Sequence, residues 1–372
     1  MTTTERSLAW VATTHRSPTD GVVLAHDTGP EPAVAPAAPD ARLDREAREE
    51  LEDGLLAPGA TRASGAGRRA REEEPDPERT CFERDRDRIL HSSAFRRLAG
   101  KTQVFVFPAD HQRTRLTHAL EVAQVATSVA RATGLNVALT EAIALGHDCG
   151  HGPGGHASED AFAPFLPEGY DHAVWGADVT LAPLNLCAET LDGIRNHSWS
   201  RPAPATPEAA VVSWADRCAY TAHDLEDAVR AGIVALDDLP AEVVAVCGRT
   251  RTEQLATFVG ALIGCVRETG VVGMRPEPAA ALAALRAFDY ARIYTRPASV
   301  AQADQVVAVL RALVEHYADA PGELPVRPEP EQAVRAAVAY VGGMTDRFAF
   351  GTALSRLGWD PARLPVGVDV RG

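Results

Sequence analysis

The sequence lacks the cysteine pattern of a disulfide-stabilised or zinc-ribbon protein. Six cysteines are spread over 372 residues, and none forms a CxxC pair. This usage is typical of free thiols in a reducing compartment. No window approaches the roughly 18 apolar residues that a membrane helix needs. The N-terminus has no basic stretch followed by an apolar core, so we expect no signal peptide. These absences predict a soluble cytoplasmic protein.

An excess of positive charge is also absent. The formal net charge is −14 at pH 7. Nucleic acids and anionic membranes are held by basic patches, so this charge argues against a general nucleic-acid binder or a membrane-surface protein. A small anionic substrate is still compatible with it, because a metal ion and a few arginines can reverse the charge locally.

Alternation typical of β-strands is rare, and KTQVFVF (101–107) is the best short candidate. After Thr80 the sequence has the apolar periodicity of successive helices. RLTHALEVAQVATSVARATG places an apolar stripe on one helix that stops at Gly134. The expected stripe residues are Leu116, Leu120, Ala123, Val125 and Val129. We therefore predict an all-α fold, a helical bundle with additional C-terminal helices and at most one small β-hairpin.

Other helix boundaries follow from capping signals. Thr140 is the expected N-cap of the helix in TEAIALGHD, and Thr206 with Pro207 is a strong start signal for the next long helix. Further helices are expected over 251–269, 276–290, 299–318 and 328–358. We predict four segments: a largely disordered tail (1–42), a helix plus charged linker (43–79), a core with the candidate site (80–235) and a C-terminal helical region packing on that core (236–372).

Polar residues interrupt three of the expected helices. His118 lies within an apolar stretch, His147 and Asp148 end the next helix, and Asp216 lies mid-helix, where an unpaired buried carboxylate is costly. A lone histidine in such a place is often a core residue bonded to a backbone carbonyl. Together, however, the four side chains make a mixed nitrogen and oxygen ligand set that suits a divalent ion such as Mn, Fe, Co or Zn. Such a set leaves positions open for catalysis.

A glycine-rich loop follows directly, in HDCGHGPGGHASE. It carries His151 and His156, and Glu159 follows His156 by three residues, an offset that suits one helical turn. A carboxylate that holds an imidazole fixes its tautomer and raises its basicity. The alternative is a surface loop whose histidines are incidental.

The helix of Asp216 carries more polar residues. Asp216, Tyr220, His223, Asp224 and Asp227 recur on one helical face. Such a stripe is usually a solvated face, but this one starts at a candidate ligand, and Tyr220 and Asp224 lie where a sugar could be held.

Arginines flank the candidate ligands. Arg115 shares the face of His118, and an arginine there suits a phosphate bound to the metal. Arg217 neighbours Asp216, although it could be a surface charge. For Arg113, a surface salt bridge is as good an explanation as a contact with phosphate.

Several motifs in this order resemble the HD-domain deoxynucleoside triphosphate triphosphohydrolases, the dGTPase-like family. They are RDRDRILHSSAFRRLAGKTQVF, RTRLTHALEVAQVA, HDCGHGPGGHASE and ADRCAYTAHDLEDA, with IYTRPASV and YVGGMTDRFA further on. The resemblance covers about Glu78 to Trp359. It implies hydrolysis of a dNTP to a deoxynucleoside and inorganic triphosphate. It also implies a divalent cofactor (Mn, Mg, Fe or Co), homo-oligomers and, in some members, an activating second nucleotide.

The resemblance further implies roles for single residues. The metal would be bound by His118, His147, Asp148 and Asp216. His156 with Glu159 would activate the attacking water, and His151 would contact the phosphate. Arg115 and Arg217 would neutralise phosphate oxygens, whereas Gln103, Tyr220 and Asp224 would hold the deoxyribose.

The sequence departs from the family pattern at a few positions. Gly154 replaces a common Phe, so the loop is expected to be looser than in relatives; Ser158 and Cys81 replace a Gly and a Pro. In YDHAVWGAD, His172 takes the position that would protonate the leaving group, but the expected neighbouring amides are missing. Two alternatives stay open: another HD phosphohydrolase, acting on a nucleoside monophosphate or an alarmone, and a catalytically weak nucleotide sensor.

Overall fold

The computed structural model describes residues 2–12, 23, 43–106 and 112–365, and the chain divides into two units, Met1–Leu43 and Asp44–Gly372. In the first unit, Thr3–Ala12 forms helix α1. The expected disordered tail (1–42) lies mostly outside the described residues and stays a prediction, as do the other predicted segment boundaries.

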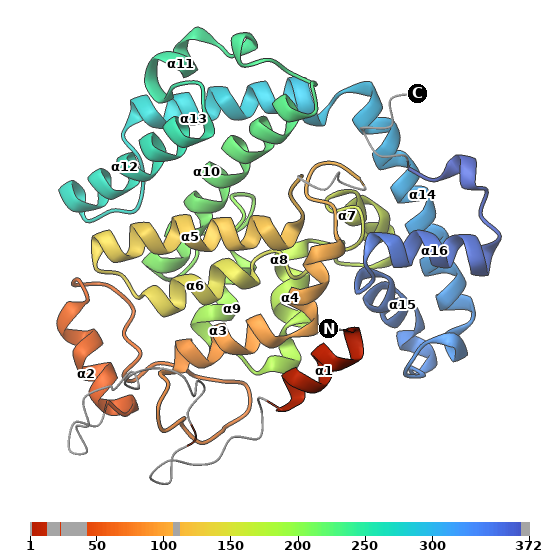
Figure 1. The fold of residues 1–372 in the computed structure, drawn as a ribbon, viewed down its shortest axis with the longest axis horizontal. Helices are drawn as coiled ribbons and strands as arrows, with labels where there is room; N and C mark the ends of the chain where they lie inside the picture. Colours follow the sequence, from red (N-terminus) through yellow and green to blue (C-terminus); the bar gives the residue numbers. More distant parts are fainter. Residues whose placement is uncertain (1, 13–22, 24–42, 107–111, 366–372) are drawn as a thin grey trace. The chain divides into compact units, whose positions relative to one another are not determined.

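The described part of the second unit consists of helices and their connections (Figure 1). The helices are α2 (Arg45–Leu55), α3 (Cys81–His91), α4 (Ser93–Arg97), α5 (Arg115–Thr133), α6 (Val137–Gly146), α7 (Ala157–Phe162), α8 (His172–Trp175), α9 (Ala188–Arg195), α10 (Pro207–Arg230), α11 (Ala241–Cys247), α12 (Arg251–Thr269), α13 (Pro276–Asp289), α14 (Pro297–Asp319), α15 (Ala333–Gly342) and α16 (Asp346–Leu357). None of the described helices is long and apolar enough to span a membrane.

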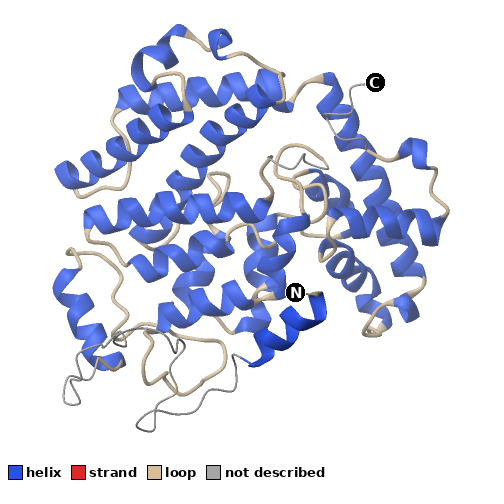
Figure 2. Cartoon of the chain, viewed as in Figure 1, coloured by secondary structure: helices blue, strands red, loops and turns tan. Residues whose placement is uncertain are grey.

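No described residue belongs to a β-strand, as Figure 2 shows, and this confirms the all-α prediction. The small hairpin considered at 101–107 does not form within its described residues. An isolated antiparallel bridge joins Thr102 to Thr114 there. Phe107 lies outside the described residues.

Helices α5 and α6 pack side by side because the chain reverses within a short turn between them. Gly134 ends α5 in the left-handed region, with a φ of 69°, as the stop signal predicted. The predicted cap of α6 was wrong: the side chain of Asn136, and not Thr140, accepts the Leu139 N–H. Thr140 lies in the first turn, and its hydroxyl donates to the carbonyl of Asn136. This turn brings the start of α5 and the end of α6 to the same region.

The first apolar core lies among α3, α5, α6, α9 and α10, and α11 to α13 extend it. Burial of each large aliphatic side chain in such a core contributes about 1.5–3 kcal/mol. The start of α10 at Thr206 and Pro207 is confirmed. In the stripe predicted for α5, Ala123, Val125 and Val129 are buried, but Leu120 is 46% exposed.

A second apolar core joins α7 to α14, α15 and α16. Phe162, Val306 and Leu310 are among its fully buried side chains. The single helix expected over 328–358 is two helices, because the chain turns at Gly343 and Thr345 then caps α16 by accepting the Phe348 N–H. The residues between the two cores carry the candidate site.

Candidate metal and phosphate site

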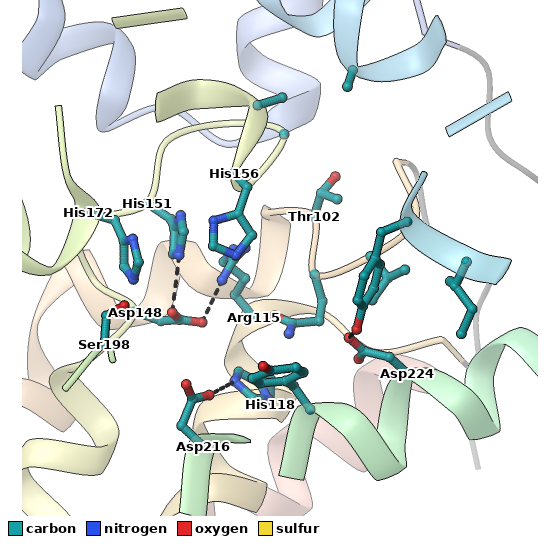
Figure 3. A pocket seen from close by; sticks show the side chains of 18 of the residues that line it. Thr102, Arg115, His118, Asp148, His151, His156, His172, Ser198, Asp216 and Asp224 are labelled. Atoms are coloured by element: carbon teal, nitrogen blue, oxygen red, sulfur yellow. Dashed lines mark hydrogen bonds and ion pairs between the residues drawn. The ribbon is translucent and has the colours of Figure 1, made fainter. Parts of the chain in front are cut away.

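A pocket of about 570 Å³ lies among α5, α10, the glycine-rich loop and α14. Side chains from distant parts of the sequence converge on it (Figure 3). Every residue predicted for the site lines this pocket except His147 and Glu159, which contact lining residues from behind. A cavity of this size suits a small-molecule ligand.

The four predicted metal ligands lie together, and all of them except His147 line the pocket. His118 comes from α5, His147 and Asp148 follow the last turn of α6, and Asp216 comes from α10. The Nε2 atom of His118 lies 3.0 Å from Oδ1 of Asp216. The ligand atoms of His118, His147 and Asp148 all lie within 4.8 Å of one another. The α5–α6 hairpin and α10 therefore bring the four side chains together, as the sequence predicted.

The hydrogen bonding of His147 shows that this group fits a cation. Its Nδ1 donates to the carbonyl oxygen of Ala144 at 2.6 Å, so Nε2 carries no proton in the neutral ring. That bare Nε2 lies 3.4 Å from an oxygen of Asp148 and 3.6 Å from one of Asp216. A lone pair facing two carboxylates is unfavourable unless a positive charge lies among them. The donor set of two imidazoles and two carboxylates suits a divalent transition metal.

Arg115 provides buried hydrogen-bond donors beside this group. Its Nη1 donates to Oδ2 of Asp148 at 2.7 Å, whereas Nε and Nη2 are buried without a partner among the described residues. Burial acts to raise the pKa of Asp148, but Arg115 and the imidazoles of His147 and His151 hold it well below its usual range. Asp148 is thus ionised, and Arg115 keeps two donor nitrogens for a further anion.

The predicted acid–base pair forms in the next part of the loop. Nδ1 of His156 lies 2.7 Å from Oε1 of Glu159, and Nδ1 of His172 lies 3.2 Å from the same oxygen. Burial acts to raise the pKa of Glu159, but the hydrogen bonds from His156 and His172 lower it well below its usual range. An ionised Glu159 holds the proton of His156 on Nδ1, so Nε2 of His156 can accept a proton from water.

His151 lies between the two groups. Its Nε2 is 3.3 Å from Oδ1 of Asp148, and its ring stacks on that of His172 with centroids 3.7 Å apart. Burial, with Arg115 nearby, lowers the pKa of His151 well below its usual range. His151 is therefore a neutral ring that can donate a hydrogen bond to an anion without competing for protons.

His197 is a site residue that the sequence reasoning missed. It follows α9 in RNHSW, and its Nδ1 donates to the carbonyl oxygen of Ile194 at 2.8 Å. Its Nε2 lies 3.2 Å from Nε2 of His172. Its position just past the end of a helix was the one hint in the sequence. No periodic pattern indicated that it lies beside His147 and Asp148.

The glycine-rich loop makes close contacts at its glycines, and the expectation that it is looser than in relatives stays a prediction. Gly154 has a φ of +72°, and a Cβ there would lie 2.4 Å from Cγ1 of Val306. Its N–H donates to Oδ1 of Asp346 at 2.9 Å. At Gly150 a Cβ would lie 1.9 Å from the carbonyl oxygen of His172. Both positions require glycine because neighbouring groups occupy the space of a side chain.

Asp346 ties the C-terminal helices to this loop. Besides the Gly154 N–H, its carboxylate accepts the N–H and the hydroxyl of Thr102, at 3.0 and 2.5 Å. Buried Lys101 acts beside it by donating from Nζ to the carbonyl oxygens of His151 and Gly342. The C-terminal region therefore holds the loop that carries His151 and His156.

Replacing Asp346 by asparagine should destabilise this connection by about 2–3 kcal/mol. The side-chain amide nitrogen of asparagine is a donor. It therefore cannot accept the hydrogen bonds that one of the Asp346 carboxylate oxygens now accepts from Thr102 or Gly154. Thermal unfolding should occur at a lower temperature, and the loop around Gly154 should exchange its amide hydrogens faster. The exposed Asp360→Asn serves as a matched control. Unchanged exchange in the loop would contradict this role of Asp346.

The other end of the pocket is polar and aromatic. Asp224 accepts a hydrogen bond from the hydroxyl of Tyr294 at 2.5 Å, and Nε of Arg286 donates to the hydroxyl of Tyr220 at 2.6 Å. Tyr294 belongs to a π-helical turn, Tyr290–Tyr294, after α13. Tyr294 and Arg286 were missed because they are distant in the sequence. This end offers carboxylate, hydroxyl and ring groups for a sugar and a base.

The polar stripe of α10 divides between two environments. Asp216, Tyr220 and Asp224 line the pocket, as does Gln103, whose Oε1 has no partner among the described residues. Arg217 stacks over Trp199 with its Cζ 3.4 Å from the ring centroid. Asp227 instead pairs with Arg113 at 2.6 Å, away from the pocket. Arg113 and Asp227 thus form a buried ion pair that supports the structure.

Asp289, at the end of α13, makes a pH dependence of stability testable. Both of its carboxylate oxygens are buried without a partner among the described residues. Burial, with a contribution from Asp224, raises the pKa of Asp289 to about 9. Because this folded-state pKa exceeds that of the unfolded chain, the group costs stability as the pH rises from about 4 to about 9.

Asp289→Asn removes that titration. Its free energy of unfolding, relative to the parent protein, should therefore increase with pH by up to about 1.4 kcal/mol per pH unit between pH 5 and 8. Urea denaturation at several pH values measures this difference. A difference that stays constant over the range would show that Asp289 is ionised in the folded protein.

Known proteins resemble the chain over most of its length. The model of the HD domain matches residues 115–221, a range that contains all four candidate metal ligands, and that of the phosphohydrolase-associated domain matches residues 272–353. A deoxyguanosinetriphosphate triphosphohydrolase-like protein of Caldanaerobacter subterraneus subsp. tengcongensis is 42% identical over 316 residues, covering 82% of this chain and 93% of the relative. Proteins of the same name from Clostridium perfringens (strain SM101 / Type A) and Desulfatibacillum aliphaticivorans are 40% and 37% identical. These matches cover 75% and 82% of this chain, and 87% and 95% of the relatives.

Proposed function

The chain belongs to the deoxyguanosinetriphosphate triphosphohydrolase-like family of HD-domain phosphohydrolases, and we propose that it hydrolyses deoxynucleoside triphosphates to a deoxynucleoside and inorganic triphosphate. The name of the relatives points to dGTP or a broader set of dNTPs as substrate. The proposal includes the four metal ligands, the acid–base pair and the substrate contacts predicted from the sequence.

One observation carries the proposal: buried Arg115 keeps two unused donors beside a ligand set that fits a cation. A buried guanidinium is costly unless its donors are satisfied, so an anion is the expected partner. Arg217 is a further cation on the wall of the same pocket. A nucleoside triphosphate has an anionic part for these arginines and a sugar and base for the opposite end.

A divalent cation bound by His118, His147, Asp148 and Asp216 would polarise a phosphate oxygen and offset negative charge. The other contacts with the substrate come from side chains of the protein. Arg115 and His151 donate to phosphate oxygens, and Arg217 adds charge. Asp224 accepts a hydrogen bond from the sugar hydroxyl, and the ring of Tyr220 stacks near the deoxyribose. The side-chain amide of Gln103 also contacts the deoxyribose. Positioning and charge neutralisation are what phosphoryl chemistry mainly requires.

The pair of His156 and Glu159 would activate the water. Glu159 fixes the His156 proton on Nδ1, so Nε2 accepts a proton as the water oxygen attacks the α-phosphorus. The bond between the α-phosphorus and the 5′ oxygen then breaks, and the proton held on His156 passes to the departing oxygen through solvent. Protonation of this oxygen by His172 stays a prediction. Both ring nitrogens of His172 already face other side chains, those of Glu159 and His197.

A product assay tests the proposal. The protein is incubated with Mn²⁺ and each dNTP in ¹⁸O-labelled water, and the products are separated by ion chromatography and weighed by mass spectrometry. Inorganic triphosphate that carries the ¹⁸O label is expected. Release of phosphate or pyrophosphate would instead indicate another HD phosphohydrolase. Nucleotide-induced thermal stabilisation without any product would indicate a sensor.

A further inference from the structure

Arg217 carries a positive charge at the wall of the pocket without a carboxylate to balance it. Among the described residues it forms no ion pair, and its Nε atom is buried without a hydrogen-bond acceptor. Burial and the nearby charge of Arg286 both lower the pKa of Arg217. A half-buried guanidinium in such a place is stabilised when an anion binds beside it.

The indole ring of Trp199 covers one face of this guanidinium. Cζ of Arg217 lies 3.4 Å from the ring centroid, which is a close stacking contact. Both side chains line the pocket, although Arg217 belongs to α10 and Trp199 to the turn after α9. The ring attracts the cation, and the attraction is larger where water is excluded. Because the N–H bonds of a guanidinium lie in its plane, the stack blocks none of them.

The ring of Trp199 is itself attached to the helix that carries Arg217. Its Nε1 donates to the backbone carbonyl of Ser213 at 3.2 Å, one helical turn before Arg217. The hydroxyl of Ser213 donates in turn to the carbonyl of His197 at 2.5 Å. The ring of Trp214 packs edge-on against Trp199, with centroids 4.6 Å apart. The place of the indole ring is therefore set by contacts other than that with Arg217.

Burial of the indole does not explain why a tryptophan occupies this position. Trp199 is 45% exposed, so much of its apolar surface stays in contact with water. Its hydrogen bond, its edge contact and its stack instead combine to present one aromatic face to a cation. This arrangement restricts the guanidinium before any ligand binds. An arginine is otherwise flexible, and ordering it costs conformational entropy on binding.

We propose that Trp199 is a positioning residue that holds the guanidinium of Arg217 in the orientation in which its N–H groups bind the triphosphate of the substrate. The inference rests on the proposed function and deepens it, because it assigns a role in substrate affinity to a side chain that acts only through another. Trp199 contributes no proton and no ligand to the reaction. It makes the binding of the polyanion tighter by ordering Arg217 in advance.

The affinity for inorganic triphosphate tests the inference without relying on turnover. Calorimetric titration of the full-length protein loaded with Mn²⁺ measures it. Trp199→Leu replaces the ring with an apolar side chain that has no aromatic face, and it should weaken binding about 3–30-fold, the range for a partly desolvated cation–π contact. Trp199→Phe keeps an aromatic face and should recover most of the affinity. Binding of a deoxynucleoside, which carries no phosphate, should not change.

Two further variants show whether the effect passes through the arginine. In an Arg217→Ala background, Trp199→Leu should weaken triphosphate binding little further, because the stack has already been removed. Trp359→Ala is the matched control: Trp359 also stacks on an arginine, with Cζ of Arg363 4.8 Å from its ring centroid, but neither residue lines the pocket. It should bind triphosphate as the parent protein does. Circular dichroism checks the fold of every variant.

Steady-state kinetics with a dNTP give a second readout. Trp199→Leu should raise KM by the factor by which it weakens triphosphate binding, whereas kcat should change much less, because the lost contact is present before and during the reaction. A purely structural role of Trp199 would instead lower kcat and weaken deoxynucleoside binding as well.

The remaining outcomes separate this inference from the proposed function. Parent-like triphosphate affinity in Trp199→Leu, or equal losses in the Leu and Phe variants, would overturn the positioning role. So would full additivity with Arg217→Ala, or a parent protein that does not bind triphosphate. The expected affinities in a protein that hydrolyses no dNTP would support the role of Trp199 and contradict the proposed reaction instead.

Discussion

Replacing His147 with alanine is expected to remove the cation of the four-ligand site and hydrolysis together. The bare Nε2 of His147 faces the carboxylates of Asp148 and Asp216, so its loss leaves two buried anions with one fewer neutral ligand. A metal ion supplies several kcal/mol of transition-state stabilisation, and each 1.36 kcal/mol is a factor of ten in rate. Turnover should therefore fall by about 10³-fold or more.

The measurement combines metal content with turnover on the same preparation. His316→Ala is the matched control, because this histidine is also paired with a carboxylate but lies outside the pocket. A fold check by circular dichroism excludes simple unfolding. Full hydrolysis by His147→Ala, or cation binding as tight as in the parent protein, would show that His147 is a core histidine and not a ligand.

The candidate metal ligands stand out in the sequence because they break a local rule. His118 and Asp216 occupy helix positions where an apolar residue would be expected, and His147 with Asp148 follows a helix that is otherwise apolar. The sequence patterns also located Gly134, which reverses the chain between α5 and α6, and Thr206, which caps α10. These features depend on residues close together in the sequence.

The remainder of the site depends on tertiary packing. Asp346 is 192 residues from Gly154, so no local pattern connects its carboxylate to the loop. His197 reaches the centre because α9 packs beside α6 and α10. The contacts of Gly154 with Asp346 and Val306 also come from distant helices, so the sequence alone suggested a looser loop. The same limit explains Leu120, which fits the helical period but lies beyond the edge of the buried face.

Replacing Glu159 with glutamine is expected to keep the four-ligand cation and to reduce turnover by about 10²–10⁴-fold, the usual contribution of a general base. Glu159 lies outside the four-ligand set, and its Oε1 accepts from Nδ1 of both His156 and His172. A neutral amide no longer fixes the imidazole proton or stabilises the imidazolium that forms when His156 takes the proton of water.

The comparison of two variants separates this role from a structural one. His156→Ala should lower kcat to a similar degree, and the double variant with Glu159→Gln should be little worse than either single variant, because the two residues act as one unit. KM for the dNTP should change much less than kcat, since neither side chain is a predicted substrate contact. Multiplicative losses in the double variant, or disappearance of all bound metal in Glu159→Gln, would show that Glu159 supports the metal centre and not the base.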